Sequence, residues 1–323
     1  MSFDALFRLG WNTRWTALFA PHLDAGLVPG RVIRVDRDRV TVTTPSGDVV
    51  AVARDLPAVG DWVALADGRL TAVLPRSSAL VRRDPGRPVP QVLAANADVA
   101  FVVAALDPAA NLRRLERTLA VVWEGGCVPV VVLTKPDRCP DVAAKVAAVE
   151  AVALGVTVAV VNGLTGDGVD GLRAHLAADR TALFIGPSGA GKSTLANRLL
   201  GEERLATREV REDDRKGRHT TTARHLVVVP AGGVLIDTPG LRELAIWEAA
   251  DGVGAAFADI DELAAGCRFR DCRHASEPGC AVLGRVDAGR LRNWRQLSDP
   301  IPPAERRRRD KIAQKAYRRD FKR

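Results

Sequence analysis

The sequence predicts an α/β fold with a mainly parallel sheet, preceded by a small β-barrel and followed by a small helical domain. Three observations lead to this prediction: short β-rich runs fill residues 31–74, strand and helix patterns alternate over residues 97–185, and strand signals are sparse after residue 249. Continuous apolar strands between helices are typical of a parallel sheet that is covered on both faces. A chain of 323 residues is long enough for two or three domains.

The amino-terminal region combines an aromatic segment with short strands. Trp11, Trp15 and Phe19 follow one another at a spacing of four, which predicts a short helix or packed arm. Turn sequences separate the predicted strands, which cover residues 31–36, 39–44, 48–53, 61–65 and 69–74. Their even spacing favours a closed barrel of the oligonucleotide-binding (OB) type, which could bind RNA or only pack against its neighbour. We therefore assign residues 1–85 to an arm and an OB-type β-barrel.

The central region begins after a Pro-rich stretch at residues 82–90, which predicts a linker. An antiparallel pair at residues 220–229 and 233–236 is expected to continue the parallel sheet. The assigned domains are a central domain at 91–248, a helical domain at 249–304 and a basic tail at 305–323. In the central domain we expect strands at 97–106, 128–133, 156–161 and 181–185, and helices at 112–123, 142–154 and 169–177.

A phosphate-binding loop follows the strand at 181–185. The segment reads GPSGAGKST and matches the spacing GxxxxGK[ST]. Glycines let backbone N–H groups surround an anion, and a helix beginning at Lys192 adds its dipole and its unpaired first-turn donors. Lys192 is expected to reach the β- and γ-phosphates, and the Ser193 hydroxyl to hold Mg²⁺. The predicted nucleotide contacts are Gly186, Pro187, Ser188, Gly189, Ala190, Gly191, Lys192, Ser193 and Thr194.

Two further segments have the pattern of a nucleotide-dependent switch. Asp237-Thr-Pro-Gly240 follows an apolar strand and matches DxxG, in which Asp237 orders Mg²⁺ through water and the Gly240 N–H senses the γ-phosphate. The segment GRHTTT at 217–222 lies between this motif and the phosphate loop. Thr221 or Thr220 is expected to offer its hydroxyl to Mg²⁺; the sequence does not choose between them, and Thr221 is our working assignment.

The base-reading element lies upstream of the phosphate loop. Thr134-Lys135-Pro136-Asp137 matches [NT]KxD at the end of the strand at 128–133. Asp137 would accept hydrogen bonds from guanine N1 and N2, which adenine cannot offer, and Lys135 would lie along the ring. Asn162 and Gly163, after the next strand, would supply backbone donors to guanine O6. The order of these loops is that of a circularly permuted P-loop GTPase domain.

The helical domain contains a Cys₃His set with the spacing C-x4-C-x-H-x5-C. Three cysteines and one histidine suit tetrahedral Zn²⁺, and four protein ligands leave no open position for catalysis. We therefore expect a structural zinc site in a domain with little core of its own. The alternative is three reduced cysteines and a surface histidine. Cys127 and Cys139 lie apart from the cluster and are interpreted as packing residues.

Charge and composition indicate a nucleic-acid partner and a cytoplasmic protein. Residues 305–323 hold ten Lys/Arg against three acidic residues, which is nearly all of the net charge of +8. Such a tail is expected to meet a polyanion such as nucleic acid, although a solvated charged helix is the alternative. We find no signal peptide and no apolar run that could span a membrane. Five cysteines without a signal predict a reducing compartment, and hence the cytoplasm.

The barrel, the order TKPD, GPSGAGKST, GRHTTT and DTPG, and the segment CRFRDCRHASEPGC together resemble the bacterial ribosome small-subunit-dependent GTPase A (RsgA) family over essentially the whole chain. The resemblance implies a monomeric GTPase that binds GTP and GDP and contacts 16S rRNA of the 30S subunit late in its maturation. It also implies hydrolysis stimulated by the subunit. The zinc ligands that it implies are Cys267, Cys272, His274 and Cys280.

The sequence departs from the usual pattern at two positions. Thr134 stands where asparagine is commoner in GTPases, a change expected to loosen the hydrogen bonding of the base loop. Asn162-Gly163 stands where Ser-Ala is usual, which makes the assignment of the base-supporting loop weaker.

The residues expected near the γ-phosphate predict slow GTP hydrolysis by the protein alone. Leu241 follows DxxG, where many GTPases carry the glutamine that orients water, and leucine can neither donate nor accept a hydrogen bond. In the family His219 is a proposed water-orienting residue; the alternative is a loop histidine without a role. Two other functions stay open: an RNA-binding assembly factor that uses GTP mainly as a conformational ligand, and a permuted GTPase that acts on tRNA or a membrane target. The tail and barrel favour RNA over a membrane.

Overall fold

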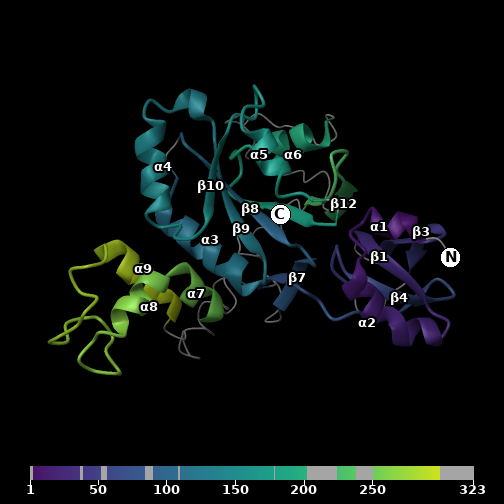
Figure 1. Cartoon of the computed structure of the whole chain (residues 1–323), viewed down its shortest axis with the longest axis horizontal. Coiled ribbons are helices and arrows are strands. Elements are labelled where there is room, and N and C mark those ends of the chain that lie inside the picture. Colours follow the sequence, from purple (N-terminus) through teal and green to yellow (C-terminus); the bar gives the residue numbers. More distant parts are fainter. Residues whose placement is uncertain are drawn as a thin grey trace, which may run out of the picture.

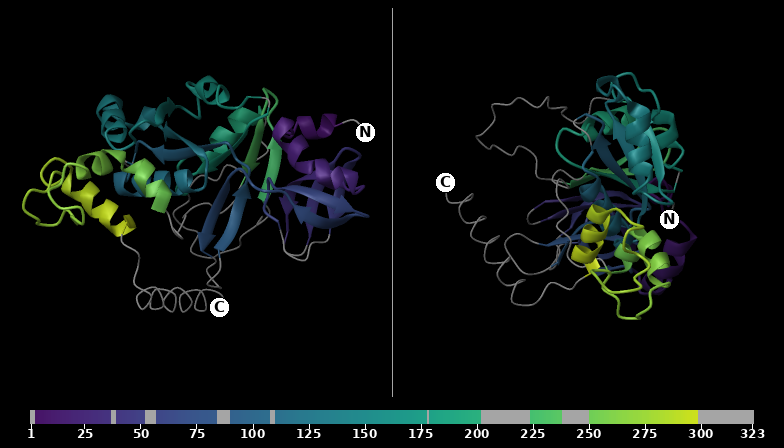
Figure 2. Two further views of the ribbon diagram at one scale, coloured as in Figure 1. Left: turned by 60° about the horizontal axis from the view of Figure 1, so that its bottom comes forward. Right: turned by 90° about the vertical axis from the view of Figure 1, so that its left-hand side faces the viewer.

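The computed structural model describes residues 3–36, 39–51, 57–83, 90–107, 110–177, 179–201, 224–237 and 250–298. The N-terminal helices and the C-terminal helices lie at opposite ends of a central sheet, in both the view of Figure 1 and the left view of Figure 2. Among the described residues, no helix is long and apolar enough to cross a membrane.

The central sheet has the predicted parallel strands. Their order is β10-β9-β8-β11-β13, and the antiparallel strand β12 follows β13. The antiparallel pair that was expected to continue the sheet is therefore confirmed. The bounds of these strands are β8 (Val99–Ala105), β9 (Val128–Thr134), β10 (Thr157–Val161), β11 (Thr181–Ile185), β12 (Arg224–Val228) and β13 (Val234–Asp237).

Four helices cover the two faces of this sheet. Side chains of β8 alternate between the faces: Ala100 and Val102 pack with α3 and α4, whereas Phe101 packs with α5 and α6. The helices are α3 (Leu112–Glu124), α4 (Val142–Glu150), α5 (Val169–Arg173) and α6 (Lys192–Leu200). Helices α4 and α5 end four residues before the predicted positions. Turns with helix-like backbone hydrogen bonds follow each of them, so the apolar period continues after the helix has ended.

The amino-terminal strands are confirmed, but their closure into a barrel is not. Strands β1 (Val28–Val35), β2 (Val40–Thr44), β3 (Gly47–Ala51), β4 (Trp62–Ala66) and β5 (Arg69–Val73) pair in the order β3-β2-β1-β4-β5. No pairing of β3 with β5 occurs among the described residues, so the OB-type barrel stays a prediction. Strand β1 also pairs with β12, through Arg34 opposite His225, which makes one sheet continuous across both regions.

The aromatic segment packs against the strands, as predicted. Helices α1 (Asp4–Phe7) and α2 (Thr13–Asp24) carry or flank Trp11, Trp15 and Phe19, all of them buried. Both tryptophans contact Trp62 of β4, with ring centroids 4.9 Å and 5.7 Å from it. These aromatic side chains therefore form core rather than a binding surface.

A buried arginine connects this region to the central sheet. Arg31 of β1 is 1% exposed and stacks on the Trp62 ring at 4.9 Å. Its Nη2 atom donates a 2.8 Å hydrogen bond to the hydroxyl of Thr181, the first residue of β11. Burial lowers the pKa of Arg31 to about 10, against the attraction of Asp98 and Asp61. The arginine thus stays charged at neutral pH and ties β1 to the strand that leads into the phosphate loop.

The predicted linker at residues 82–90 is wrong at both ends. Strands β6 (Ala79–Arg83) and β7 (Pro90–Ala95) form a separate antiparallel hairpin. Proline is tolerated at the first position of a strand, so Pro90 does not prevent pairing. The Pro-rich sequence therefore connects two strands of one hairpin.

The carboxyl-terminal region is helical, and two of its helices pack on α3. The helices are α7 (Ala250–Ala256), α8 (Ala258–Ala264) and α9 (Ala288–Ser298), of which α7 and α9 contact α3. No strand occurs within residues 250–298, as predicted. Glu116 of α3 is 0% exposed and accepts hydrogen bonds from Arg290 at 2.9 Å and Asn293 at 2.7 Å. Arg290 also pairs with Asp259 at 2.6 Å. These buried ion pairs and hydrogen bonds thus join α3 to α9, which is far from it in the sequence.

Candidate functional site

Glycines determine the backbone shape of the phosphate loop, and the side chain of Lys192 donates hydrogen bonds to carbonyls of the same loop. Gly186 has φ 154°, and a Cβ atom there would lie 2.2 Å from the carbonyl oxygen of Val103. Gly191, with φ 92°, precedes the first residue of α6. The Nζ atom of Lys192 donates to the carbonyls of Gly186 and Pro187, each at 2.7 Å. The backbone therefore curls around the lysine at the amino terminus of α6, the arrangement that an anion requires.

The base loop leaves β9 and contacts the phosphate loop. Thr134 is 2% exposed, and its hydroxyl donates to the carbonyl of Ala190 at 2.7 Å. Lys135 has φ 59°, a left-handed conformation that is uncommon for a residue other than glycine. A 3-10 turn, Pro136–Arg138, follows and carries Asp137. The Thr134 hydroxyl thus makes a buried hydrogen bond to the phosphate loop, and the expectation that threonine loosens the base loop relative to asparagine stays a prediction.

The base-supporting loop leaves β10 beside the base loop. The Oδ1 atom of Asn162 accepts hydrogen bonds from the backbone N–H groups of Leu164 at 2.9 Å and Thr165 at 3.3 Å. Its Nδ2 atom donates to Asp137 Oδ1 at 3.3 Å. The sequence predicted backbone donors here and missed this side-chain contact. The asparagine thus orders its own loop and orients the carboxylate that is expected to read guanine.

These loops lie at one edge of the sheet. All the strands from β10 to β13 in the order β10-β9-β8-β11-β13 run parallel, so their carboxyl ends lie at this one edge. Proteins with α/β sheets bind ligands at that edge. The backbone of β13 brings Asp237 to the same edge. The other switch predictions lie outside the described residues: His219, Thr220, Thr221, Gly240 and Leu241. The basic tail at 305–323 lies outside them as well.

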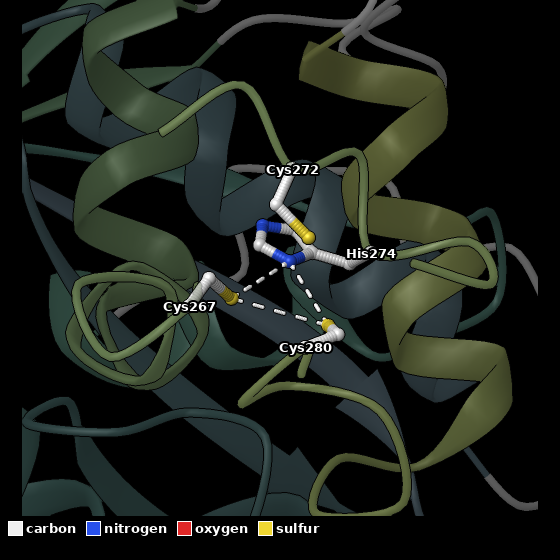
Figure 3. Close-up of side chains that lie close together, drawn as sticks. All are labelled: Cys267, Cys272, His274 and Cys280. Carbon is white, nitrogen blue, oxygen red and sulfur yellow. Dashed lines mark hydrogen bonds between the residues drawn. The ribbon is translucent and has the colours of Figure 1, made fainter. Parts of the chain in front are cut away.

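The Cys₃His residues form a cluster between α8 and α9. The side chains of Cys267, Cys272, His274 and Cys280 point toward one another (Figure 3), and their ligand atoms all lie within 4.8 Å. His274 Nδ1 lies 3.5 Å from Cys267 Sγ and 3.4 Å from Cys280 Sγ, and these two sulfurs are 3.9 Å apart. A tetrahedral zinc site with its usual bond lengths has edges of about 3.6 to 3.8 Å. The spacing of Cys267, His274 and Cys280 is therefore close to that of a zinc site, and Cys272 lies near enough to complete the set.

Neighbouring groups hold the cluster in this form. His274 is 3% exposed, and its ring lies 5.3 Å from that of Trp294 in α9. The backbone N–H of Ala281 donates to Cys267 Sγ at 3.2 Å. Desolvation raises the pKa of Cys280, but hydrogen bonds from the Leu283 backbone and from His274 outweigh it and lower the pKa to about 6. A thiolate at neutral pH is the form of cysteine that binds metal.

Cys127 lies apart from the cluster and is buried, whereas the three cysteines of the cluster are partly exposed. Its thiol is buried and donates to the carbonyl of Ala97 at 3.2 Å. Burial raises its pKa to about 12, against a hydrogen bond with Ser78. These properties agree with the interpretation of Cys127 as a packing residue.

Comparison with known proteins places this arrangement in a family. The family model "RsgA GTPase" matches residues 73–247. A "Small ribosomal subunit biogenesis GTPase RsgA" of Streptomyces coelicolor is 47% identical, over 91% of this chain and 86% of that protein. The protein named "Small ribosomal subunit biogenesis GTPase RsgA 2" of Lactiplantibacillus plantarum is 42% identical, over 84% of this chain and 83% of that protein.

Two crystal structures have the same fold. YjeQ from Thermotoga maritima aligns with a TM-score of 0.64 at 24% identity, over 84% of this chain and 97% of that one. YloQ, described as a circularly permuted GTPase, aligns with a TM-score of 0.58 at 23% identity, over 84% of this chain and 94% of that one. The predicted α/β fold and its permutation are thus confirmed. The chain belongs to the RsgA GTPase family and is a circularly permuted, GTP-hydrolysing enzyme.

Proposed function

We propose that this protein acts in the biogenesis of the small ribosomal subunit, binding the 30S subunit and its 16S rRNA late in maturation and hydrolysing GTP in response. The names of its relatives support this function. The observation that carries the GTPase part of this proposal is the contact of Thr134 with Ala190, because it joins the loop that we propose reads guanine to the loop that we propose binds phosphate. A GTPase with this geometry has a site for the whole nucleotide.

In the proposed site the nucleotide spans the edge of the sheet. Asp137 reads the guanine edge, and the first turn of α6 holds the phosphates. Lys192 leaves its carbonyl partners for the β- and γ-phosphates, a more strongly charged acceptor. Ser193, Thr221 and Asp237 would hold Mg²⁺. The nucleotide contacts are Thr134, Lys135, Pro136, Asp137, Asn162, Gly163, Gly186 through Thr194, Asp237 and Gly240.

The proposed dependence on the subunit follows from the residue after DxxG. Leu241 cannot orient the attacking water, so a group that the ribosome positions, with His219 as the candidate, completes the site. Turnover by the protein alone is therefore slow, and 30S subunits raise it.

Exposed arginines in the segment that carries the cluster support rRNA as the partner. Arg268, Arg270, Arg273, Arg285 and Arg292 are all exposed. Arg268 lies 5.5 Å from the ring centroid of the exposed Phe269. Guanidinium groups bind phosphates, and aromatic rings stack on unpaired bases. One structural Zn²⁺, bound by the Cys₃His cluster, would hold this segment in shape.

The chain is proposed to work as four parts. These are an arm with an OB-type barrel at 1–85, the permuted GTPase domain at 91–248, the zinc-binding helical domain at 249–304 and the basic tail at 305–323. The barrel, the zinc domain and the tail would share the rRNA contacts. In the GTPase domain, the switch segments would change conformation in response to these rRNA contacts.

GTP turnover with purified subunits tests this function. Phosphate release is measured for the full chain alone, with 30S subunits and with 50S subunits, and K192A provides the background rate. We expect stimulation by 30S subunits that is absent for 50S subunits and lost at high salt, because phosphate contacts are screened. Equal stimulation by both subunits, or none, contradicts the proposal.

A further inference from the structure

The base-supporting loop lies on the helix that follows the phosphate loop. A Cβ atom built on Gly163 would be 3.0 Å from Cγ2 of Thr194, so the backbone of this loop contacts the first turn of α6. Only the side chain of Thr194 therefore separates residue 163 from the first turn of α6, where the phosphates are proposed to bind. The position of this loop relative to α6 decides the distance between the two halves of a bound nucleotide.

Arg198 fastens the loop to the helix. It lies four residues after Thr194 and therefore on the same face of α6. Its Nε atom donates to the carbonyl of Gly163 at 3.0 Å, and its Nη2 atom donates to the carbonyl of Leu164. One guanidinium thus binds two consecutive carbonyls of the loop. A fork of this kind needs the planar arginine group, which the single point charge of lysine cannot imitate.

We propose that Arg198 is a positioning residue for guanine recognition. It holds the loop against the phosphate-binding helix, and Asn162 at the start of that loop orients the carboxylate of Asp137. The proposal rests on the guanine-reading role of Asp137 in the proposed function. Arg198 touches neither base nor phosphate in this arrangement and acts through the loop.

The surroundings of Arg198 separate this role from one in folding. Its side chain is exposed, so its removal leaves no cavity in the core. Arg173 of α5 provides a matched control. Its Nη2 atom donates to the backbone carbonyl of Arg198 at 3.2 Å, and its Nη1 atom pairs with Asp170 of its own helix. Removing Arg173 deletes a partly exposed arginine that contacts the same helix and keeps the fork on the loop.

Fluorescent diphosphates test the proposal in the full-length chain. Dissociation constants for mant-GDP and mant-ADP are measured for wild type, R198A, R198K and R173A, and circular dichroism verifies folding. For R198A we expect mant-GDP to bind about five- to tenfold more weakly, which corresponds to the loss of about one net hydrogen bond. Mant-ADP should change by less than about twofold, because adenine makes no bond to Asp137. R198K should match R198A, and R173A should match wild type.

A double-mutant cycle tests the pathway through the loop. If Arg198 acts through Asn162, the double variant R198A/N162A loses less mant-GDP affinity than the sum of the two single variants. Additive losses, an equal loss of mant-GDP and mant-ADP in R198A, or wild-type mant-GDP affinity in R198A or R198K would each overturn the proposal. A wild-type chain that binds both nucleotides equally would instead overturn the proposed guanine site, and the role of Arg198 with it.

Discussion

The hydroxyl of Thr134 donates a 2.7 Å hydrogen bond to the carbonyl of Ala190, 56 residues further along the chain. Thr134 is the last residue of β9, and Ala190 lies in the phosphate loop after β11, with β8 between the two strands. The bond therefore spans the gap at the edge of the sheet and sets the base loop against the phosphate loop.

Replacement of Thr134 by valine tests this contact. T134V keeps the shape of the side chain but leaves the buried Ala190 carbonyl without its partner, which costs about 1–3 kcal/mol. We expect weaker GDP binding, by about fivefold or more, in isothermal titration. T134S keeps the hydroxyl and should bind GDP like wild type. Equal affinities for T134V and T134S would show that the hydrogen bond does not position the loop.

Replacement of Glu116 tests the connection of the C-terminal helices to α3. Glu116 has an exposed fraction of 0%, and E116A leaves Arg290 buried with one carboxylate partner fewer. Breaking one side of a buried ion pair costs about 3–5 kcal/mol. Urea unfolding should show a loss of this order, whereas D170A, which removes an exposed partner of Arg173, should change little. Similar midpoints for E116A and wild type would contradict the account.

The pH dependence of stability tests the surroundings of Asp98, an exposed residue whose carboxylate accepts a hydrogen bond from the Thr181 N–H. Partial desolvation raises the pKa of Asp98, although the Thr181 N–H and Arg31 act in the opposite direction. A carboxyl whose pKa is raised on folding contributes stability below its unfolded pKa, near 4, and loses that contribution as the pH rises through its folded pKa. Wild type should therefore lose stability relative to D98N as the pH rises above about 4, and the free energy of unfolding of D98N minus that of wild type should increase. A difference that is constant with pH would contradict the assignment.

Metal analysis and removal test the Cys₃His cluster. We expect about one zinc per chain, and its chelation should lower the temperature of unfolding, because the ion replaces a core in this segment. C272S should lose the zinc. Cys139 lies outside the cluster, so C139S should keep it. Retention of zinc by C272S and its loss from C139S would place the metal elsewhere.

Local patterns predicted most of the fold and the motifs of the site. Each parallel strand is an apolar run with turn residues at its ends, and the phosphate loop needs its glycines at positions that the spacing reveals. The β6–β7 hairpin was missed because proline at the start of β7 resembles a linker signal.

Long-range side-chain contacts could not be predicted. The amide of Asn162 meets Asp137 from a different loop, and Glu116 meets Arg290 across 174 residues. The spacing of residues within one segment does not reveal such pairs, because they depend on which elements become neighbours in the folded protein.

The guanine-reading role of Asp137 is the central claim, and a change of base preference tests it most directly. Guanine offers N1–H and N2–H donors to a carboxylate, whereas xanthine carries an oxygen in place of the N2 amine and needs a donor opposite it. Calorimetric titration of GDP and XDP into wild type and D137N should therefore give a GDP preference for wild type and an XDP preference for D137N. A D137N protein that still prefers GDP would contradict the account.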